Sequence, residues 1–286
     1  MKARMGTIAS TICALIFTVF AAAGPAAAPV EKNMILAAAT GAQDSGLLDA
    51  LLPAFEKETG YSVKTIAVGS GRALTMGRKG EADVLLVNYP DAEKQFMKDG
   101  LGSRRLLVMH NDFIIVGPDN DPAKIRGLRS SVDAFRKIAA AGALFISRGV
   151  NSGTHARERI IWWTAGIQPE REKWYQQTGL GMGQTLQVAS QRRGYTLADR
   201  GTYLAARKRI ALELLVQGDG NLLNVYHVIE VNASNQPKVN AAGARAFADF
   251  LVSPRARKII GNFGKEEFGS PLFFPGAGKS EDKPGR

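Results

Sequence analysis

The sequence predicts an α/β protein, because apolar segments with strand and helix patterns alternate in the first part of the chain. Residues 34–39 form a short apolar run, and residues 43–58 place large apolar side chains at helical spacing. Residues 61–68 alternate as a strand does, residues 73–79 follow as a helix, and residues 82–87 form another apolar strand. This order predicts a mostly parallel sheet with helices on both faces. Ligands of such sheets bind beyond the carboxyl ends of the strands.

Two apolar segments, residues 112–117 and 225–232, are expected to cross between two lobes. A second strand-and-helix unit lies between them in the sequence. The last helices, expected at 242–251 and 254–263, return to the first lobe. The predicted fold class is therefore α/β, with two doubly wound lobes joined by crossing segments. Lobe I comprises residues 29–116 and 224–275, and lobe II comprises residues 117–223.

The N-terminus has the layout of a cleaved secretory signal. Lys2 and Arg4 precede the mostly apolar residues 7–20, and two runs of three alanines follow. We assign residues 1–28 to the signal peptide without fixing the cleavage site, and we expect export to the periplasm. No other segment reaches the roughly 20 apolar residues of a membrane span. Residues 276–286 are small and charged, and they are expected to form a disordered tail.

Composition and charge limit the kinds of partner. The single cysteine, Cys13, falls inside the expected signal, which excludes a disulfide and a thiolate metal site in the exported chain. Without Lys2 and Arg4 the chain keeps 35 basic and 26 acidic residues, a net charge of +9. These charges are scattered, and the sequence has no interleaving of basic and aromatic residues typical of nucleic-acid binding. Attraction of small anions explains the charge better than a nucleic-acid partner does.

Residues 147–155, with the sequence S-R-G-V-N-S-G-T-H, are predicted to form an oxyanion pocket. They end an apolar strand and open a helix, so that Ser152, Gly153 and Thr154 lie at the helix start. The unpaired amides and the positive dipole end of a helix N-terminus favour an anion. Arg148 adds a planar guanidinium suited to oxyanions. The alternative interpretation is an ordinary Ser/Thr helix cap beside a surface arginine.

Other conspicuous residues are interpreted as structural. Asp44 is expected in the first turn of the helix at 43–58, and Asp199 is expected to pair with Arg200. No catalytic signature of the G-x-S-x-G, H-E-x-x-H or P-loop type occurs, so we expect no catalytic residue, no cofactor and no enzyme activity. The histidines are too widely spaced for a metal motif, and several aromatic residues are expected in the core. These histidines are His110, His155 and His227, and the aromatic residues are Trp162, Trp163, Phe273 and Phe274.

Several segments, in order along the chain, are similar to the tungstate-binding proteins of bacterial ABC importers. They are Q-D-S-G-L-L-D-A-L-L-P-A-F-E-K at 43–57, G-S-G-R-A-L at 69–74, G-E-A-D-V-L-L-V at 80–87, N-D-F-I-I-V-G-P at 111–118, S-R-G-V-N-S-G-T-H at 147–155, W-Y-Q-Q-T-G-L-G-M-G-Q-T-L at 174–186, Y-T-L-A-D-R-G-T-Y at 195–203 and G-S-P-L-F-F-P at 269–275. Chance does not produce so many matches in order.

The resemblance implies a type II periplasmic binding protein, which closes two α/β lobes on one tetrahedral oxyanion. It also implies delivery of that anion to an ABC permease in the inner membrane. The expected ligand is tungstate, with molybdate as the alternative, and we expect a monomer. The alternative role of Thr40, Ser70 and Gly71 is in turns and helix caps. The implied ligand contacts are Thr40, Gly41, Ser70 and Gly71 from lobe I and Arg148, Ser152, Gly153 and Thr154 from lobe II.

One segment departs from the family pattern. After the first strand the family carries T-T-T-S, whereas this chain has Ala38, Ala39, Thr40 and Gly41. A hydrogen bond to a charged group is worth roughly 1.5 to 3 kcal/mol, so the lost hydroxyls affect the ligand more than the fold. Restoring them is expected to tighten oxyanion binding. Two alternatives stay open: a drifted ligand, such as phosphate, another oxyanion or a small organic acid, and an anion-binding protein used for sensing.

Overall fold

The structure is a computed structural model that describes residues 32–149, 151–276, 278 and 279. The described residues belong to one compact unit. The expected signal peptide and most of the expected tail lie outside them. No helix among the described residues is long and apolar enough to cross a membrane. We keep the names lobe I and lobe II for the two predicted groups of residues, whose boundaries stay a prediction.

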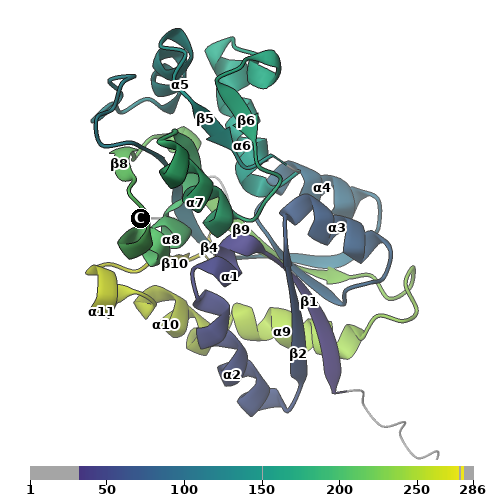
Figure 1. Cartoon of the computed structure of the whole chain (residues 1–286). Coiled ribbons are helices and arrows are strands. Elements are labelled where there is room, and N and C mark those ends of the chain that lie inside the picture. The colour runs from purple at the N-terminus through teal and green to yellow at the C-terminus, as the bar shows by residue number, and fades with distance from the viewer. Residues whose placement is uncertain (1–31, 150, 277, 280–286) are drawn as a thin grey trace, which may run out of the picture. The chain divides into compact units, whose positions relative to one another are not determined.

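Strands and helices alternate through the first part of the described chain, as the sequence predicts (Figure 1). The expected helix at 43–58 is divided in two, because Gly46 adopts a left-handed φ of 83° and interrupts it. The elements are β1 (Asn33–Ala39), α1 (Thr40–Asp44), α2 (Leu47–Thr59), β2 (Ser62–Val68), α3 (Ser70–Arg78), β3 (Val84–Val87), α4 (Pro90–Lys98) and β4 (Gly102–Gly117).

The remaining elements build lobe II and then return to lobe I. Lobe II holds α5 (Ser131–Ala140), β5 (Phe145–Ser147), α6 (Gly153–Ala165), β6 (Tyr175–Gln177), α7 (Met182–Arg192), β7 (Thr196–Asp199), α8 (Arg200–Ala206) and β8 (Glu213–Val216), with 3-10 helices at Pro169–Arg171, Arg207–Arg209 and Gly220–Leu222. The chain ends with β9 (Leu223–Val231), α9 (Ala241–Leu251), α10 (Pro254–Asn262), α11 (Lys265–Phe268) and β10 (Phe274–Pro275).

The sheet is mixed rather than mostly parallel. Its main path runs β10-β4-β9-β3-β1-β2. Strand β1 pairs in parallel with β2 and β3, and β5 pairs in parallel with β6. Strand β9 is antiparallel to both β3 and β4, and β4 is antiparallel to β7 and β8. The alternating strand and helix pattern predicted the parallel pairs, but the sequence pattern of β4 and β9 carries no information on their direction.

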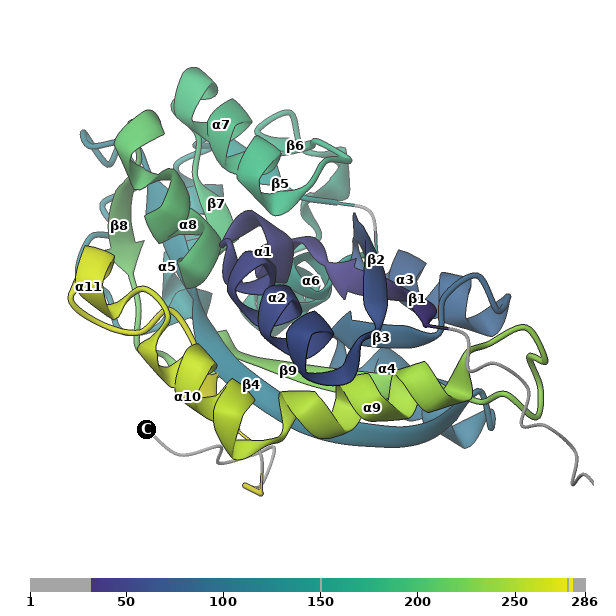
Figure 2. The same cartoon turned by 90° about the horizontal axis from the view of Figure 1, so that it is seen from below.

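Strand β4 serves both parts of the fold. It pairs with β9 as far as Asp112 and with β7 from Phe113 onward, and Figure 2 shows its long curved path beside β9. Apolar side chains of Phe113 to Val116 accordingly pack into the clusters that also contain Trp162 and Leu186. Two other clusters pack against β1, β3 and β9; one contains Phe55 and the other contains Phe96. A continuous strand therefore links the apolar cores of the two predicted lobes.

Two adjacent pairs of aromatic residues divide between core and surface. Trp162 and Phe273 are buried as expected, whereas Trp163 is 79% exposed and Phe274 is 40% exposed. Neighbouring residues point about 100° apart on a helix, and to opposite faces on a strand, so both members of such a pair rarely face one core. The expectation that all four are core residues is wrong for Trp163 and Phe274.

Candidate functional site

Arg148 lies directly after β5 and is a buried cation without a close counter-charge. Only 4% of the residue is exposed. Its Nε donates to the Leu180 carbonyl at 3.1 Å. Among the described residues it forms no ion pair within 4.0 Å, although Asp44 and Asp199 act on its charge from farther away. Burial lowers the pKa of the guanidinium, but an arginine stays protonated in proteins. Its two terminal amino groups therefore remain as charged donors.

Ser152 and Thr154 flank the start of α6 and differ in how their hydroxyls are used. Ser152 is the N-cap: its Oγ accepts from the His155 amide at 3.1 Å and donates to the Gly149 carbonyl at 3.4 Å. The cap role considered for this motif is thus fulfilled by the Ser152 side chain. Among the described residues, the buried Thr154 hydroxyl contacts only the weak acceptor Sδ of Met182, at 3.9 Å. Thr154 therefore keeps a donor for a stronger acceptor.

Ser70 and Gly71 open α3 and also have structural partners. The Ser70 hydroxyl donates to Asn88 Oδ1 at 2.6 Å and accepts from the Asn88 amide at 3.1 Å. The Gly71 amide donates to the Asn151 carbonyl of lobe II at 2.9 Å. A Cβ at Gly71 would lie 2.4 Å from Asn151 atoms. The N-cap of α3 is Gly69, so Ser70 is not its cap; the Ser70 hydroxyl instead ties α3 to Asn88. Gly71 is required for close approach of the lobes.

Gly153 marks a second close approach between the lobes. A Cβ there would lie 2.3 Å from the Asn88 carbonyl oxygen. Any side chain at this position would push α6 away from the residues that follow β3. The motif glycine therefore permits contact between the lobes, a role that the helix-start reading of the sequence does not reveal.

Thr40 and Gly41 begin α1 and face lobe II and the connecting strand β9. Thr40 Oγ1 accepts from the Met182 amide at 3.4 Å, which leaves its hydroxyl proton available. A Cβ at Gly41 would lie 2.7 Å from the Tyr226 hydroxyl and 3.4 Å from Asp199 Oδ2. The preceding Ala38 and Ala39 pack in the apolar cluster around α2 and are at most 1% exposed. Of the segment 38–41, only Thr40 offers a hydroxyl.

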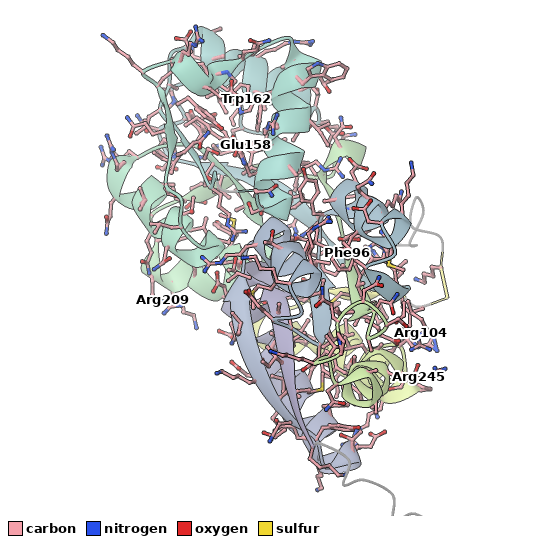
Figure 3. All side chains as sticks on the ribbon, turned by 90° about the vertical axis from the view of Figure 1, so that its right-hand side faces the viewer. Phe96, Arg104, Glu158, Trp162, Arg209 and Arg245 are labelled. Atoms are coloured by element: carbon pink, nitrogen blue, oxygen red, sulfur yellow. The ribbon has the colours of Figure 1, made fainter. Side chains whose placement is uncertain are left out.

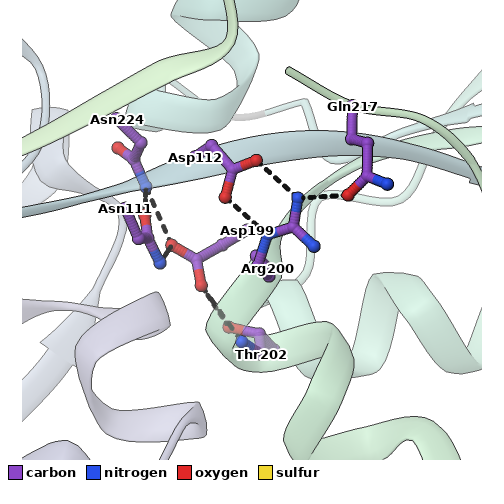
Figure 4. Close-up of polar contacts among 7 residues, drawn as sticks. All are labelled: Asn111, Asp112, Asp199, Arg200, Thr202, Gln217 and Asn224. Carbon is purple, nitrogen blue, oxygen red and sulfur yellow. Dashed lines mark hydrogen bonds and ion pairs between the residues drawn. The ribbon is translucent and has the colours of Figure 1, made fainter. Parts of the chain in front are cut away.

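Asp199 is a buried carboxylate at the N-cap of α8, in contact with both connecting strands (Figure 4). Its Oδ2 accepts from Asn111 at 3.1 Å and from Asn224 and Tyr226 at 2.8 Å each. Its Oδ1 accepts from the Thr202 amide at 3.0 Å. Burial raises the pKa of Asp199, while these donors lower it. These four donors satisfy the hydrogen bonding of the buried carboxyl group.

The expected pair between Asp199 and Arg200 is wrong. Arg200 instead binds Asp112 through two hydrogen bonds of 2.6 Å, and it also donates to Gln217 at 2.8 Å (Figure 4). Residues 199 and 200 belong to a strand end and a helix start, so their side chains leave the backbone in different directions. Sequence adjacency gave no information on this geometry.

Asp44 lies elsewhere than expected. It is the last residue of α1 rather than a first-turn residue, because Gly46 separates α1 from α2. Its Oδ2 accepts from the amide of Gly183 in lobe II at 3.0 Å. The Asp44 residue is exposed, yet desolvation by the neighbouring backbone of lobe II raises the pKa of its carboxyl, and the Gly183 amide and the charge of Arg148 lower it. Asp44 therefore joins the lobes instead of stabilising its own helix.

Glu158 is a buried carboxyl that sequence reasoning missed. It lies in the body of lobe II beside Trp162 (Figure 3) and accepts from Ser147 Oγ, Tyr175 OH and Trp162 Nε1. Burial raises its pKa to about 7. Because Ser147 directly precedes Arg148, this cluster fixes the strand end from which the guanidinium emerges. The spacing of Glu158 and Trp162, four residues apart on one helix face, was the available signal.

The histidines do not gather. Among the described residues, no group of three or more His, Cys, Asp or Glu side chains is placed to hold a metal ion. His227 lies 2.8 Å from Glu93 in lobe I, and Arg105 pairs with the same carboxylate. His155 is at the start of α6, where burial lowers its pKa. The predicted site is therefore built around Arg148 rather than around histidines.

A family model and several known proteins are similar to this chain. Residues 24–255 match the PBP superfamily domain. The chain is 45% identical to the tungstate-binding protein TupA of Peptoclostridium acidaminophilum, over 96% of this chain and 100% of that protein.

Two solved structures are similar in both sequence and fold. A crystal structure of the tungstate ABC transporter from Geobacter sulfurreducens is 42% identical with a TM-score of 0.75, covering 82% of this chain and 100% of that one. The tungstate-binding protein TupA from Desulfovibrio alaskensis G20 is 43% identical with a TM-score of 0.70, covering 86% and 99%. The chain therefore belongs to the PBP superfamily and, within it, to the family of the tungstate-binding proteins TupA.

Proposed function

We propose that this chain is an exported solute-binding protein that captures tungstate, or the similar anion molybdate, and delivers it to an ABC permease. The observation that carries the proposal is the buried Arg148 guanidinium, which has no ion pair within 4.0 Å among the described residues. A buried charge without a partner is costly. A ligand anion held between the lobes supplies the missing counter-charge.

The chemistry around Arg148 suits a small oxyanion. Tungstate and molybdate are fully deprotonated near neutral pH and only accept hydrogen bonds. Thr40 and Thr154 retain hydroxyl protons close to the contact between the lobes, and Arg148 adds charged donors. The proposed ligand-binding residues remain those of the sequence prediction: Thr40, Gly41, Ser70, Gly71, Arg148, Ser152, Gly153 and Thr154. Ser70 and Ser152 act in this proposal through the helix starts that they hold.

Closure of the lobes is part of the proposed mechanism. Contacts across the lobes occur at Gly71, Gly153 and Thr40. An anion that touches both lobes favours the closed arrangement and is released when the lobes separate. No chemical reaction is involved. We further propose that the protein acts as a monomer in the periplasm after removal of its signal peptide.

One observation favours a second candidate, a binding protein of the same fold with a drifted ligand. Ala38 and Ala39 are packed in the core, and Gly41 lies against the Tyr226 hydroxyl. Lobe I therefore offers fewer hydroxyls than the family pattern implies. Phosphate, another oxyanion or a small organic acid would be the ligand in that case, and a sensory role would use the same closure.

Calorimetric titration tests the proposal. The protein, purified from the periplasmic fraction, is titrated with tungstate, molybdate, sulfate and phosphate. The proposal expects tungstate and molybdate to bind more tightly than phosphate. Preference for phosphate would establish the drifted ligand, and no binding of any anion would refute the oxyanion site. Loss of tungstate uptake in cells lacking the protein would separate transport from sensing.

A further inference from the structure

Helix α7 lacks a side-chain cap for its first-turn amides, although the Gln184 side chain accepts from the Gly181 amide at 3.4 Å. Its N-cap residue is Gly181, so no side chain at that position can accept from the first-turn amides. Two side chains of lobe I do so instead. Thr40 Oγ1 accepts from the Met182 amide at 3.4 Å, and Asp44 Oδ2 accepts from the Gly183 amide at 3.0 Å. The helix is therefore capped by residues that lie about 140 positions earlier in the chain.

We propose that Asp44 is a latch between the lobes, whose contact with the Gly183 amide holds the closed state and slows release of the anion. The inference rests on the proposed function. Asp44 is a positioning residue here, because it acts on the closed arrangement and is not assigned as a ligand contact. The contact can exist only when α1 and α7 meet, so separation of the lobes removes it.

Electrostatics favour a carboxylate at this place. The N-terminus of a helix carries unpaired amides and the positive end of the helix dipole. A carboxylate accepts from such amides and also interacts favourably with the dipole, so it stabilises the helix start more than a neutral hydroxyl does. Helix α7 has eleven residues, whose peptide dipoles add along its axis. The positive charge of Arg148 acts on Asp44 in the same direction. Opening the lobes therefore separates the Gly183 amide and the Asp44 carboxylate from each other.

Residues 180–183, at the start of α7, contact both Arg148 and Asp44. Arg148 Nε donates to the carbonyl of Leu180, directly before the N-cap Gly181. The guanidinium that is proposed to bind the anion thus holds the turn that leads into α7. Asp44 binds that same turn from lobe I. An anion on Arg148 and the Asp44 contact consequently stabilise the same closed geometry.

The test compares Asp44→Ala and Asp44→Asn with Asp49→Ala. Asp49 is, like Asp44, an exposed aspartate, and it lies on the neighbouring α2, where its carboxylate accepts a long bond from Gln43 at 3.4 Å. We expect Asp44→Ala to weaken tungstate binding about threefold to tenfold, the scale of a lost helix cap, and Asp44→Asn to lose less because its amide oxygen still accepts. Asp49→Ala should bind as the wild type does.

Kinetics separate a latch from a general loss of structure. Stopped-flow measurements with tungstate should show faster dissociation in Asp44→Ala and an unchanged association rate, because the latch forms after the anion enters. Unchanged affinity, or tighter binding in Asp44→Ala, would overturn the proposal; tighter binding would mean that Asp44 competes with the anion for α7. A slower association with unchanged dissociation would also overturn it.

Removing the donor tests the same contact from the other side. Gly183→Pro lacks the amide, and the first turn of a helix tolerates proline. Gly183→Ala keeps the amide and places its Cβ 3.5 Å from Asp44 Oδ2, an ordinary contact, so it serves as the reference. If the contact is the latch, Gly183→Pro and Asp44→Ala speed dissociation and their double variant is no worse than either alone. Additive effects would overturn it.

A measurement without ligand distinguishes failure of the latch from failure of the proposed function. If the wild type binds none of the four anions, the proposed function fails. Hydrogen exchange of the Met182 and Gly183 amides still tests the contact in that event. Faster exchange in Asp44→Ala, but not in Asp49→Ala, supports the latch, and equal exchange in all three proteins overturns it.

Discussion

Replacement of Arg148 by alanine is the most direct test of the proposed anion site. Arg148 Nε is already engaged with Leu180, so the ligand is left with the two terminal amino groups of the guanidinium. These groups can bind two oxygens of one tetrahedral anion side by side. Hydrogen bonds that involve a charged group are worth roughly 1.5 to 3 kcal/mol each. Losing two therefore weakens binding by about 3 to 6 kcal/mol.

Since each 1.4 kcal/mol is a factor of ten, tungstate affinity should fall by roughly a hundredfold to ten-thousandfold in Arg148→Ala. Arg148→Lys should recover only part of this loss, because an ammonium binds as a point charge and lacks the planar fork. Lysine also has no group that can replace Nε at Leu180 while it reaches the anion. The order of affinity is therefore wild type, then lysine, then alanine.

Calorimetric titration of the three proteins with tungstate gives these affinities directly. Thermal unfolding without ligand is the control, since it shows whether Arg148→Ala remains folded at the temperature of titration. An alanine protein that is folded and binds tungstate as the wild type does would refute the role of Arg148. Equal binding by the lysine and wild-type proteins would refute the paired geometry but not the charge.

Four other changes have expected results. Tungstate at a hundredfold excess over Kd should stabilise the protein by about 2.7 kcal/mol and raise Tm by about 5 to 10 °C; an unchanged radius of gyration in small-angle scattering would contradict closure. Ala38→Thr should lower the free energy of unfolding, measured in urea, by about 1 to 3 kcal/mol, because the packed core around Ala38 leaves no space for the larger side chain. An unchanged free energy of unfolding would contradict this tight packing. Gly41→Ser should weaken tungstate binding by collision with the Tyr226 hydroxyl, and Tyr226→Phe in the same protein should relieve it; unaltered affinity in Gly41→Ser would contradict the collision. Burial raises the pKa of Glu158 to about 7 in the folded state, so between about pH 4.5 and 7 the folded protein keeps a proton that the unfolded chain has lost. The free energy of unfolding should therefore fall by about 3 kcal/mol as the pH rises through this range. Urea titrations of Glu158→Gln should show no such fall, and the same pH dependence in the variant would contradict the role of Glu158.

The prediction for the segment 38–41 reverses the one made from sequence. Hydroxyls at these positions are expected to tighten binding if the segment is compared with the family pattern alone. In the structure Ala38 shares a core cluster with Leu36 and Leu48, and Gly41 has the Tyr226 hydroxyl 2.7 Å from its Cβ position. Added atoms therefore meet packed neighbours before they meet a ligand. For added hydroxyls to tighten binding, the side chains packed around this segment would have to change as well.

Local patterns predicted the elements, because they depend on periodicity within a few residues. Leu47, Leu51 and Phe55 are buried on one face of α2, as their spacing indicated. Strand direction was less accessible, because β4 and β9 lie more than a hundred residues apart and pair antiparallel. No local pattern reports on such a pairing.

For the site as well, features that depend on neighbouring residues in the sequence could be predicted, whereas contacts between distant segments could not. The S-R-G-V-N-S-G-T-H motif predicted a helix start beside a cation, and Ser152 does cap α6. The approach of Gly71 to Asn151 and the partner of Asp44 depend on contacts across the lobes. Glu158 was missed because its three donors come from β5, β6 and its own helix, which the chain brings together only on folding.

The hydrogen bonding of Asp199 bears on the choice between tungstate and phosphate. A carboxylate oxygen offers about two lone pairs, and Asp199 Oδ2 already accepts from Asn111, Asn224 and Tyr226. This carboxylate lies 3.4 Å from the Cβ position of Gly41 and acts on the charge of Arg148, so it borders the proposed site. Phosphate keeps a proton for part of the time near neutral pH and needs an acceptor for it, whereas tungstate needs none. Because Asp199 has no acceptor capacity to spare at Oδ2, its surroundings favour a ligand without protons over one that must donate a hydrogen bond.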